Sequence, residues 1–203
     1  MTYLFEHPAL VAALAGQHLA LVLAALVCAC AIALPLGLFI ARRPRVRGPV
    51  IGVLSAFYTI PSLALLALLV EAVGLGPAPI FVALVAYGQF MLVRNVVAGV
   101  LAVDPAQRDA ARGVGFSPLQ LALRVDAPQA LPVITGGIRV CAVTMIALAT
   151  LGGYVGAGGL GSLIFLGLTL HHNDEIVAGS LAACALAVAC DLALRSLERA
   201  VRF

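Results

Sequence analysis

The 203-residue sequence contains no lysine and no tryptophan, and only 10% of its residues are charged. A soluble domain carries about 25% charged residues, so a water-soluble globular fold is excluded. The absence of lysine also excludes a Walker A loop, because that motif needs a lysine to reach the nucleotide phosphates. The chain therefore cannot bind and hydrolyse ATP through such a loop.

Apolar residues take the place of charge and make up 63% of the chain. A membrane-spanning helix needs about 20 of them in succession. Five segments meet this need and predict transmembrane helices over approximately residues 18–41, 50–70, 79–101, 133–153 and 176–194. The apolar stretch at 160–170 is too short to cross a bilayer and predicts a re-entrant or interfacial element. The sequence thus predicts an all-α membrane protein with one transmembrane domain over residues 1–203.

The basic residues, which number 12 and are all arginine, lie mainly in three groups. One group follows the first span, one lies in the polar segment after the third span, and one closes the chain. Because basic residues accumulate in cytoplasmic loops, this distribution predicts an N-terminus outside the cell and a C-terminus inside. The arginines form no stripe interleaved with aromatic residues, so we expect no nucleic-acid partner.

Potential metal ligands are present, but their spacing does not favour a metal site. The five cysteines all fall within predicted spans, and Cys28 and Cys30 point to different faces of a helix. His171 and His172 are adjacent, so their side chains diverge unless the loop bends. We expect the cysteines to act as small packing residues and predict no bound metal.

The polar segment, residues 104–132, separates the third and fourth predicted spans. Asp104 and Ser117 are each followed by proline and, three residues after the cap, by glutamine, which is typical of a capped helix start. Gly113 and Gly115 lie between these starts and suit the positive φ of a helix end. We predict two short ordered helices joined by a glycine turn. From spacing alone, a docking surface and a plain connector remain equally open.

Prolines predict two further breaks. Pro128 and Pro132 are expected to end the second short helix before the fourth span begins, because proline lacks the N–H that a helix needs. Pro61 interrupts the second span, either as a structural kink alone or as part of a translocation path. The residues of that candidate path are Tyr58, Thr59, Pro61 and Ser62.

Charges inside the apolar runs need partners. Arg94, near the end of the third span, is expected to reach the interface or to pair with Asp104 or a dimer partner. Asp191 in the fifth span is expected to pair with Arg195, four residues further along the helix.

The polar segment resembles the EAA motif of ABC importer permeases, which reads Glu-Ala-Ala, three residues, Gly, nine residues, Ile-x-Leu-Pro. The chain departs from it at Asp109, Val125 and Ala127, where the family has Glu, Ile and Leu. In the family this segment is the coupling helix, which is seated in a groove of the cytoplasmic ATPase subunit. The resemblance implies that the ATPase is contacted by Asp109, Ala110, Ala111, Gly115, Phe116 and Pro128.

Three other segments look like one subfamily, the permease subunits of binding-protein-dependent importers of quaternary amines such as glycine betaine, choline and carnitine. They are residues 58–65, Arg94-Asn95 and residues 156–161. The resemblance implies a type I (MetI-like) permease fold with five spans in the bacterial inner membrane. It also implies a cytoplasmic ATPase that uses the ATP, an extracytoplasmic binding protein, a second permease copy or paralogue, and surrounding lipid. No enzymatic activity and no cofactor of its own are expected.

Residues 156–161 also satisfy the pattern G-x-G-x-x-G. A dinucleotide site would need a preceding strand in a soluble βαβ unit, and here the pattern follows a predicted span. We instead expect an outer gate or turn formed by Gly156, Gly158, Gly159 and Gly161.

The predicted function is therefore the permease subunit of an ATP-driven importer of a quaternary amine. Aromatic faces suit such ligands, but with no Trp and only four Tyr we do not expect high-affinity capture on this chain. The alternatives are a permease for another small solute such as an amino acid, and an ATP-independent secondary transporter. A secondary transporter predicts internal repeats and acidic residues within its spans. Asp191 is the only acidic residue that lies well inside a predicted span. The exact substrate stays open.

Overall fold

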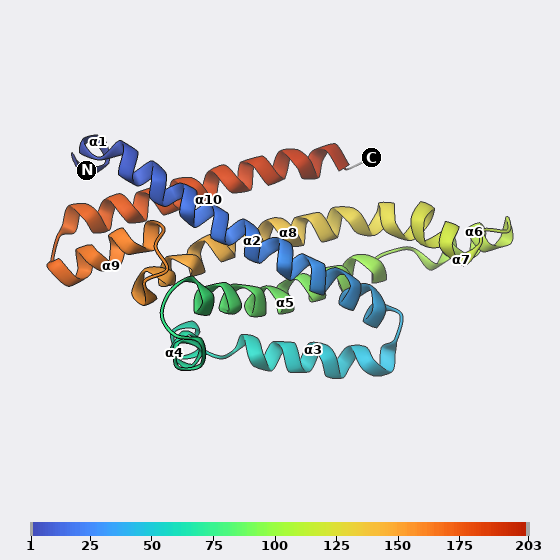
Figure 1. Ribbon diagram of the computed structural model, residues 1–203. Coiled ribbons are helices and arrows are strands. Elements are labelled where there is room, and N and C mark those ends of the chain that lie inside the picture. Colours follow the sequence, from blue (N-terminus) through green and yellow to red (C-terminus); the bar gives the residue numbers. More distant parts are fainter. Residues whose placement is uncertain (1, 202–203) are drawn as a thin grey trace.

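The computed structural model describes residues 2–201, and all regular structure in that range is helical. Figure 1 shows an elongated bundle with one short helical arm at its far end. Four helices are long and apolar enough to cross a membrane, counting α8 together with the segments that flank it. The long helices are α2 (Pro8–Ala41), α5 (Pro77–Leu101), α8 (Ala127–Ala149) and α10 (Asn173–Val201).

Shorter elements complete the bundle. A fifth span exists if α3 (Pro44–Tyr58) and α4 (Ser62–Val73) are taken together as one broken span. The remaining elements are α1 (Thr2–Glu6), α6 (Pro105–Gly113), α7 (Pro118–Leu121), a π-helical turn (Ala122–Asp126), a 3-10 helix (Thr150–Val155) and α9 (Leu160–Leu170).

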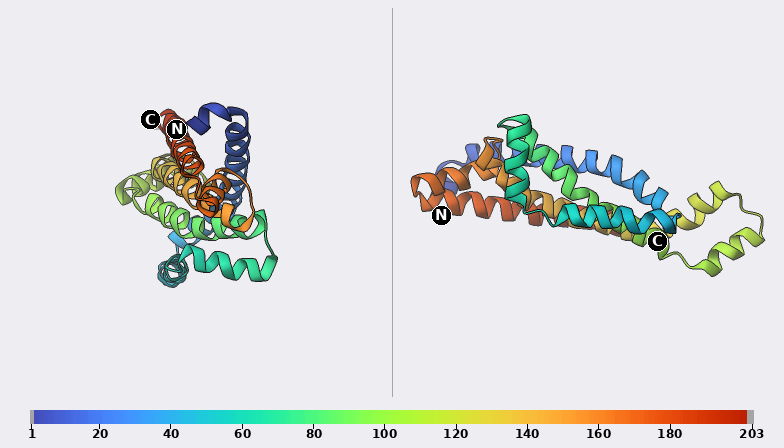
Figure 2. Two further views of the ribbon diagram at one scale, coloured as in Figure 1. Left: turned by 90° about the vertical axis from the view of Figure 1, so that its left-hand side faces the viewer. Right: turned by 90° about the horizontal axis from the view of Figure 1, so that it is seen from below.

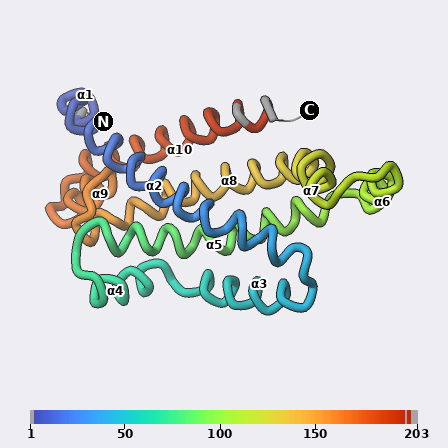
Figure 3. The backbone as a smooth tube through the Cα atoms, turned by 45° about the vertical axis from the view of Figure 1, so that its right-hand side comes forward, coloured from blue at the N-terminus to red at the C-terminus, as the bar shows by residue number. Residues whose placement is uncertain are grey.

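Helices α2, α5 and α8 form the centre, with α10 on one side and the α3–α4 pair on the other (Figure 3). The central helices approach closely because small residues lie where they cross. A Cβ on Gly37 would lie 2.7 Å from the side chain of Val96, and one on Gly88 would lie 2.5 Å from the Met145 methyl group. Without a hydrophobic driving force between helices in lipid, such close packing is a main source of their association.

The second predicted span is sharply broken. Helices α3 and α4 meet at an angle of 88°, and Figure 1 shows α4 almost end-on beside α3. Pro61 lies at the break with an extended ψ of 131°. The mid-span interruption expected at this proline is thus a right-angle bend that turns α4 across the bundle.

The prediction that Pro128 and Pro132 end the helix before the fourth span is wrong. Helical structure continues from Pro118 to Val155. The π-helical turn immediately precedes Pro128, so the wider register makes room where an α-helical carbonyl would meet the proline ring. Pro132 lies inside α8, one turn after the helix start.

Candidate functional site

The polar segment forms an arm beyond the end of the bundle, away from α1 and α9, as the right-hand view of Figure 2 shows. Its first helix, α6, begins at Asp104, whose carboxylate accepts a hydrogen bond from the amide of Ala106 at 2.8 Å. The capping box expected there is incomplete, because the Gln107 side chain instead accepts a hydrogen bond from Gln129. The complete capping box is at Ser117, whose amide and hydroxyl both bond to Gln120 at 2.8 Å and 3.3 Å.

Gly115 has a structural role that the sequence predicted. Its φ is +89°, whereas Gly113 remains part of α6. The amide of Phe116 donates to the carbonyl of Ala111 at 3.0 Å, and the amide of Gly115 donates to that of Arg112 at 2.9 Å. This pair of bonds is a Schellman motif, which ends a helix with a left-handed residue. Gly115 therefore fixes the direction in which the chain leaves α6.

A buried carboxylate attaches the arm to the bundle. Asp126, in the π-helical turn, is 7% exposed. It accepts hydrogen bonds from Arg108 Nε at 2.7 Å and from Arg42 Nη2 at 3.1 Å. Arg108 also donates from Nη2 to the carbonyl of Val100, at 2.7 Å. We call Arg42, Arg108 and Asp126 the Asp126 anchor.

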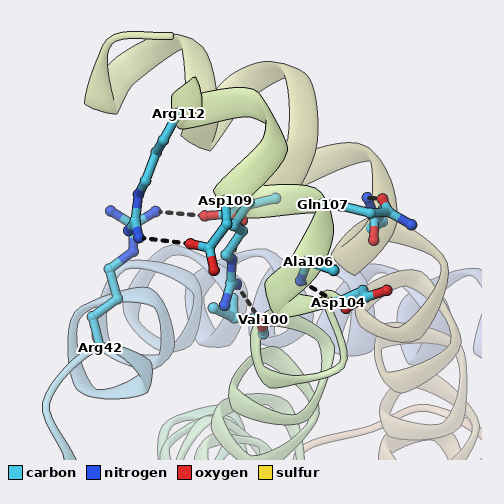
Figure 4. A network of polar contacts seen from close by, with 10 residues as sticks. Arg42, Val100, Asp104, Ala106, Gln107, Asp109 and Arg112 are labelled. Carbon is cyan, nitrogen blue, oxygen red and sulfur yellow. Dashed lines mark hydrogen bonds and ion pairs between the residues drawn. The ribbon is translucent and has the colours of Figure 1, made fainter. Parts of the chain in front are cut away.

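The Asp126 anchor joins four elements in one network. Arg42 follows the last residue of α2, Val100 belongs to the end of α5, Arg108 to α6 and Asp126 to the π-helical turn. Figure 4 shows Arg42 and Val100, which belong to the ends of α2 and α5, beneath the first helix of the arm. Hydrogen bonds therefore connect α6 to the ends of two central helices.

The predicted ATPase-contact residues lie on the arm or at its base, but they are not equally accessible. Asp109 and Ala110 are exposed on α6, and the Asp109 carboxylate pairs with Arg112 at 3.3 Å, with both side chains largely in solvent. Gly115 and Pro128 are also exposed, and Phe116 is half-buried. Ala111 is buried, so its side chain offers little surface to a docking partner.

The candidate path residues surround the α3–α4 break. Tyr58, Thr59 and Pro61 are exposed, and Ser62 is half-buried. The Thr59 hydroxyl donates to the carbonyl of Ala56 at 2.7 Å. The carbonyl of Ile60 accepts a hydrogen bond of 2.6 Å from the hydroxyl of Tyr87 on α5. A tyrosine from another helix thus donates a hydrogen bond to a backbone carbonyl at the break. The sequence pattern did not reveal this contact.

The outer glycine turn is tightly packed. Gly156, Gly158 and Gly159 have φ values of +76°, +79° and +69°. Gly161 begins α9 so close to the 3-10 helix that a Cβ there would lie 1.9 Å from the carbonyl oxygen of Thr150. The preceding element is helical, not a strand, so the dinucleotide interpretation is again excluded.

Comparison with known proteins identifies the chain. Residues 33–202 match the family described as binding-protein-dependent transport system inner membrane component. The chain belongs to this family. It is accordingly a multi-pass permease of the bacterial inner membrane, which favours the permease prediction over an ATP-independent transporter.

The relatives are permeases of the same size. The permease is 42% identical to the carnitine transport permease protein OpuCB of Listeria monocytogenes, over 90% of this chain and 84% of the relative. It is 36% identical to the glycine betaine/carnitine/choline transport system permease protein OpuCB of Bacillus subtilis, over 92% of this chain and 86% of the relative. It is 35% identical to the osmoprotectant import permease protein OsmW of Salmonella typhimurium, over 97% of this chain and 94% of the relative.

A solved structure confirms the predicted MetI-like fold of the permease. It is an inward-facing conformation of the MetNI methionine ABC transporter, which superposes with a TM-score of 0.85 over 96% of this chain and 98% of that chain. The sequence identity is 22%, so this likeness concerns the fold alone.

Charged residues of the permease found different neighbours from those expected. Asp191 forms an ion pair with Arg139 on α8 at 3.6 Å in place of the expected pair with Arg195, which lines the same pocket, and Arg139 also lies 3.5 Å from Glu198. Arg94 is exposed, and its guanidinium lies 5.9 Å from the centre of the Phe90 ring; no ion pair with Asp104 is seen among the described residues, and contact with the interface or a dimer partner stays a prediction. Among residues 2–201, no cluster of His, Cys, Asp and Glu is arranged to hold a metal ion.

Proposed function

We propose that the chain is the permease subunit of an ATP-driven importer of quaternary ammonium osmoprotectants of the glycine betaine, choline or carnitine class. An extracytoplasmic binding protein delivers the substrate, and a cytoplasmic ATPase subunit supplies the energy, so the permease needs no cofactor of its own. The names of the relatives support this substrate class, since they include carnitine, choline and glycine betaine permeases. Two permease copies, or this chain and a paralogue, enclose the path.

The observation that carries the coupling role is the attachment of α6. An exposed helix held beyond the bundle by a buried carboxylate is well suited to receive force from a partner. Asp109 and Ala110 offer a charged group and a small side chain on the exposed surface of α6. The Asp126 anchor then transmits the movement to α2 and α5. Closure of the ATPase would thereby rock the spans between inward-facing and outward-facing states.

Reconstitution tests this proposal. The permease is assembled with its ATPase and binding protein in proteoliposomes, and ATP-dependent uptake of glycine betaine, carnitine and choline is measured, with methionine as a comparison substrate. Asp109→Arg and Ala110→Leu alter the exposed surface of α6 without touching the Asp126 anchor. We expect each to lower uptake at least tenfold, which corresponds to about 1.4 kcal/mol of docking free energy.

Arg45→Glu is the matched control. Arg45 is exposed near the start of α3, outside the arm, so reversing its charge should leave uptake within twofold of the unmodified permease. Undiminished uptake by both α6 variants would contradict the coupling role. Uptake of methionine alone would contradict the substrate class.

A further inference from the structure

A pocket of about 350 Å³ lies between the end of α3 and the C-terminal half of α5. Pockets of roughly this size hold small organic molecules. Its lining combines two aromatic rings with a guanidinium and an amide, and consists of Tyr58, Phe90, Met91, Arg94, Asn95 and Ala98. Only Tyr58 belongs to the candidate path that the sequence predicted.

The polar lining indicates that this face borders water or protein rather than lipid. Arg94 is exposed, although it lies within the apolar helix α5, which ends at Leu101. A charged side chain within a span is costly against lipid and typically faces a water-filled cavity or the interior of an assembly. The surface around Arg94 is therefore a natural part of the translocation path.

The aromatic end of the pocket suits a cation. The centres of the Tyr58 and Phe90 rings lie 4.9 Å apart, and Tyr87 meets Tyr58 edge-on at 5.7 Å. Aromatic faces attract quaternary ammonium groups within about 6 Å of the ring centre. One cation already lies near this ring, because the Arg94 guanidinium is 5.9 Å from the centre of Phe90.

The other end of the pocket suits an anion. Arg94 and Phe90 are four residues apart and so lie on the same side of α5. A guanidinium provides several N–H donors in a planar arrangement that matches a carboxylate. The pocket thus presents a cation-binding surface and a carboxylate-binding group one helical turn apart.

We infer that this pocket is a transit site for zwitterions that carry both a trimethylammonium group and a carboxylate. The ammonium group rests against Tyr58 and Phe90, and the carboxylate draws the Arg94 guanidinium away from the Phe90 ring. Choline has the ammonium group but no carboxylate. The Arg94 guanidinium therefore repels the choline cation, and no carboxylate–guanidinium pair offsets this repulsion. This inference rests on the proposed function and adds that the permease itself favours betaines over choline.

Uptake in proteoliposomes that contain the ATPase and the binding protein tests the site. With binding protein saturated by each substrate, we expect Arg94→Gln to lower maximal uptake of glycine betaine and carnitine about tenfold, because a hydrogen-bonded charge is lost. Choline uptake should stay within twofold or increase. Arg94→Lys keeps the charge and should restore at least a third of zwitterion uptake.

The aromatic end is tested in the same assay. Tyr58→Leu should lower uptake of all three substrates about threefold to tenfold, since all carry the quaternary ammonium group. Tyr58→Phe keeps the ring and should stay near the unmodified value. Arg43→Gln is the matched control for Arg94→Gln. The Arg43 guanidinium also lies over a phenylalanine ring, 3.8 Å from the centre of Phe39, but Arg43 is outside the pocket.

The outcomes separate the two proposals. If the unmodified permease imports these substrates and Arg94→Gln lowers all three equally, or none, the transit site is wrong while the proposed function stands. If the unmodified permease imports none of them, both are wrong. Assembly of each variant with the ATPase, measured by size-exclusion chromatography, distinguishes loss of the site from loss of folding, and Arg94→Lys must assemble and transport for the inference to hold.

Discussion

Replacing Asp126 by asparagine removes one charge from the Asp126 anchor with almost no change in shape. The Asp126 side chain is 9% exposed, and its partners differ, because Arg108 is 23% exposed and Arg42 is 59% exposed. An exposed ion pair contributes about 0–1 kcal/mol, so the contact with Arg42 is the weaker one. Hydrogen bonds to charged groups that are shielded from water contribute about 1.5–3 kcal/mol, which describes the contact with Arg108.

We therefore expect Asp126→Asn to cost about 2–3 kcal/mol in the stability of the arm's attachment. The loss is smaller than for a full deletion because the asparagine oxygen still accepts one hydrogen bond. Since opening of the arm is local, the assay is hydrogen–deuterium exchange of the α6 amides in detergent or nanodiscs. A loss of 2–3 kcal/mol corresponds to about 30- to 150-fold faster exchange where exchange follows the opening equilibrium.

Asp104→Asn is the control for this measurement. It makes the same chemical change in the same segment, but asparagine caps a helix as well as aspartate does, so exchange in α6 should change less than threefold. The reasoning is refuted if both variants exchange alike, or if Arg42→Gln accelerates exchange more than Arg108→Gln. A larger effect of Arg42→Gln would mean that the more buried contact, between Arg108 and Asp126, is not the stronger of the two.

Three further substitutions follow from local geometry. Gly115→Ala places a Cβ on a residue with φ +89°, which costs about 1–2 kcal/mol and should raise exchange at the end of α6, whereas Gly113→Ala, in the helix, should not. Gly161→Ala would drive a Cβ against the Thr150 carbonyl oxygen, which costs about 1–3 kcal/mol of overpacking and should lower the midpoint of thermal unfolding measurably; equal midpoints for Gly161→Ala and Gly52→Ala, where a Cβ would meet nothing within 4 Å, would contradict this packing. Tyr87→Phe removes the hydrogen bond to Ile60, costs about 0.5–1.5 kcal/mol, and should increase the spread of distances between spin labels on α3 and α4, which an unchanged spread would contradict.

The features that sequence reasoning predicted correctly are local. A cap needs an acceptor side chain and an amide two or three residues away, so Asp104 and Ser117 could be recognised without knowledge of the fold. The left-handed turn at Gly115 follows from glycine alone. The sharp end of α6 and the complete capping box at Ser117 were thus visible in about fifteen consecutive residues.

The features that it missed depend on distant parts of the chain. Asp126 meets Arg42 across a sequence separation of 84 residues, and no local pattern joins the two. The error at Pro128 has a different origin, because the proline rule assumes an α-helical register. The π-helical turn supplies another register, which only the packed structure reveals.

The contacts divide the permease into a stiff part and an adaptable part. Helices α2 and α5 cross at Gly37 with no room for a Cβ, and the Asp126 anchor connects the ends of both helices to the arm through hydrogen bonds. Helix α3 is held less tightly, because it has no fully buried residue, whereas α4 contributes Leu66 to the main core and the Tyr87 hydroxyl holds the break beside Pro61. The proposed transit site lies at the boundary, with Tyr58 on the adaptable side and Phe90 and Arg94 on the stiff side. Under the proposed coupling role, a movement of the arm would change the separation between the two halves of this pocket and would link ATPase docking to release of the substrate.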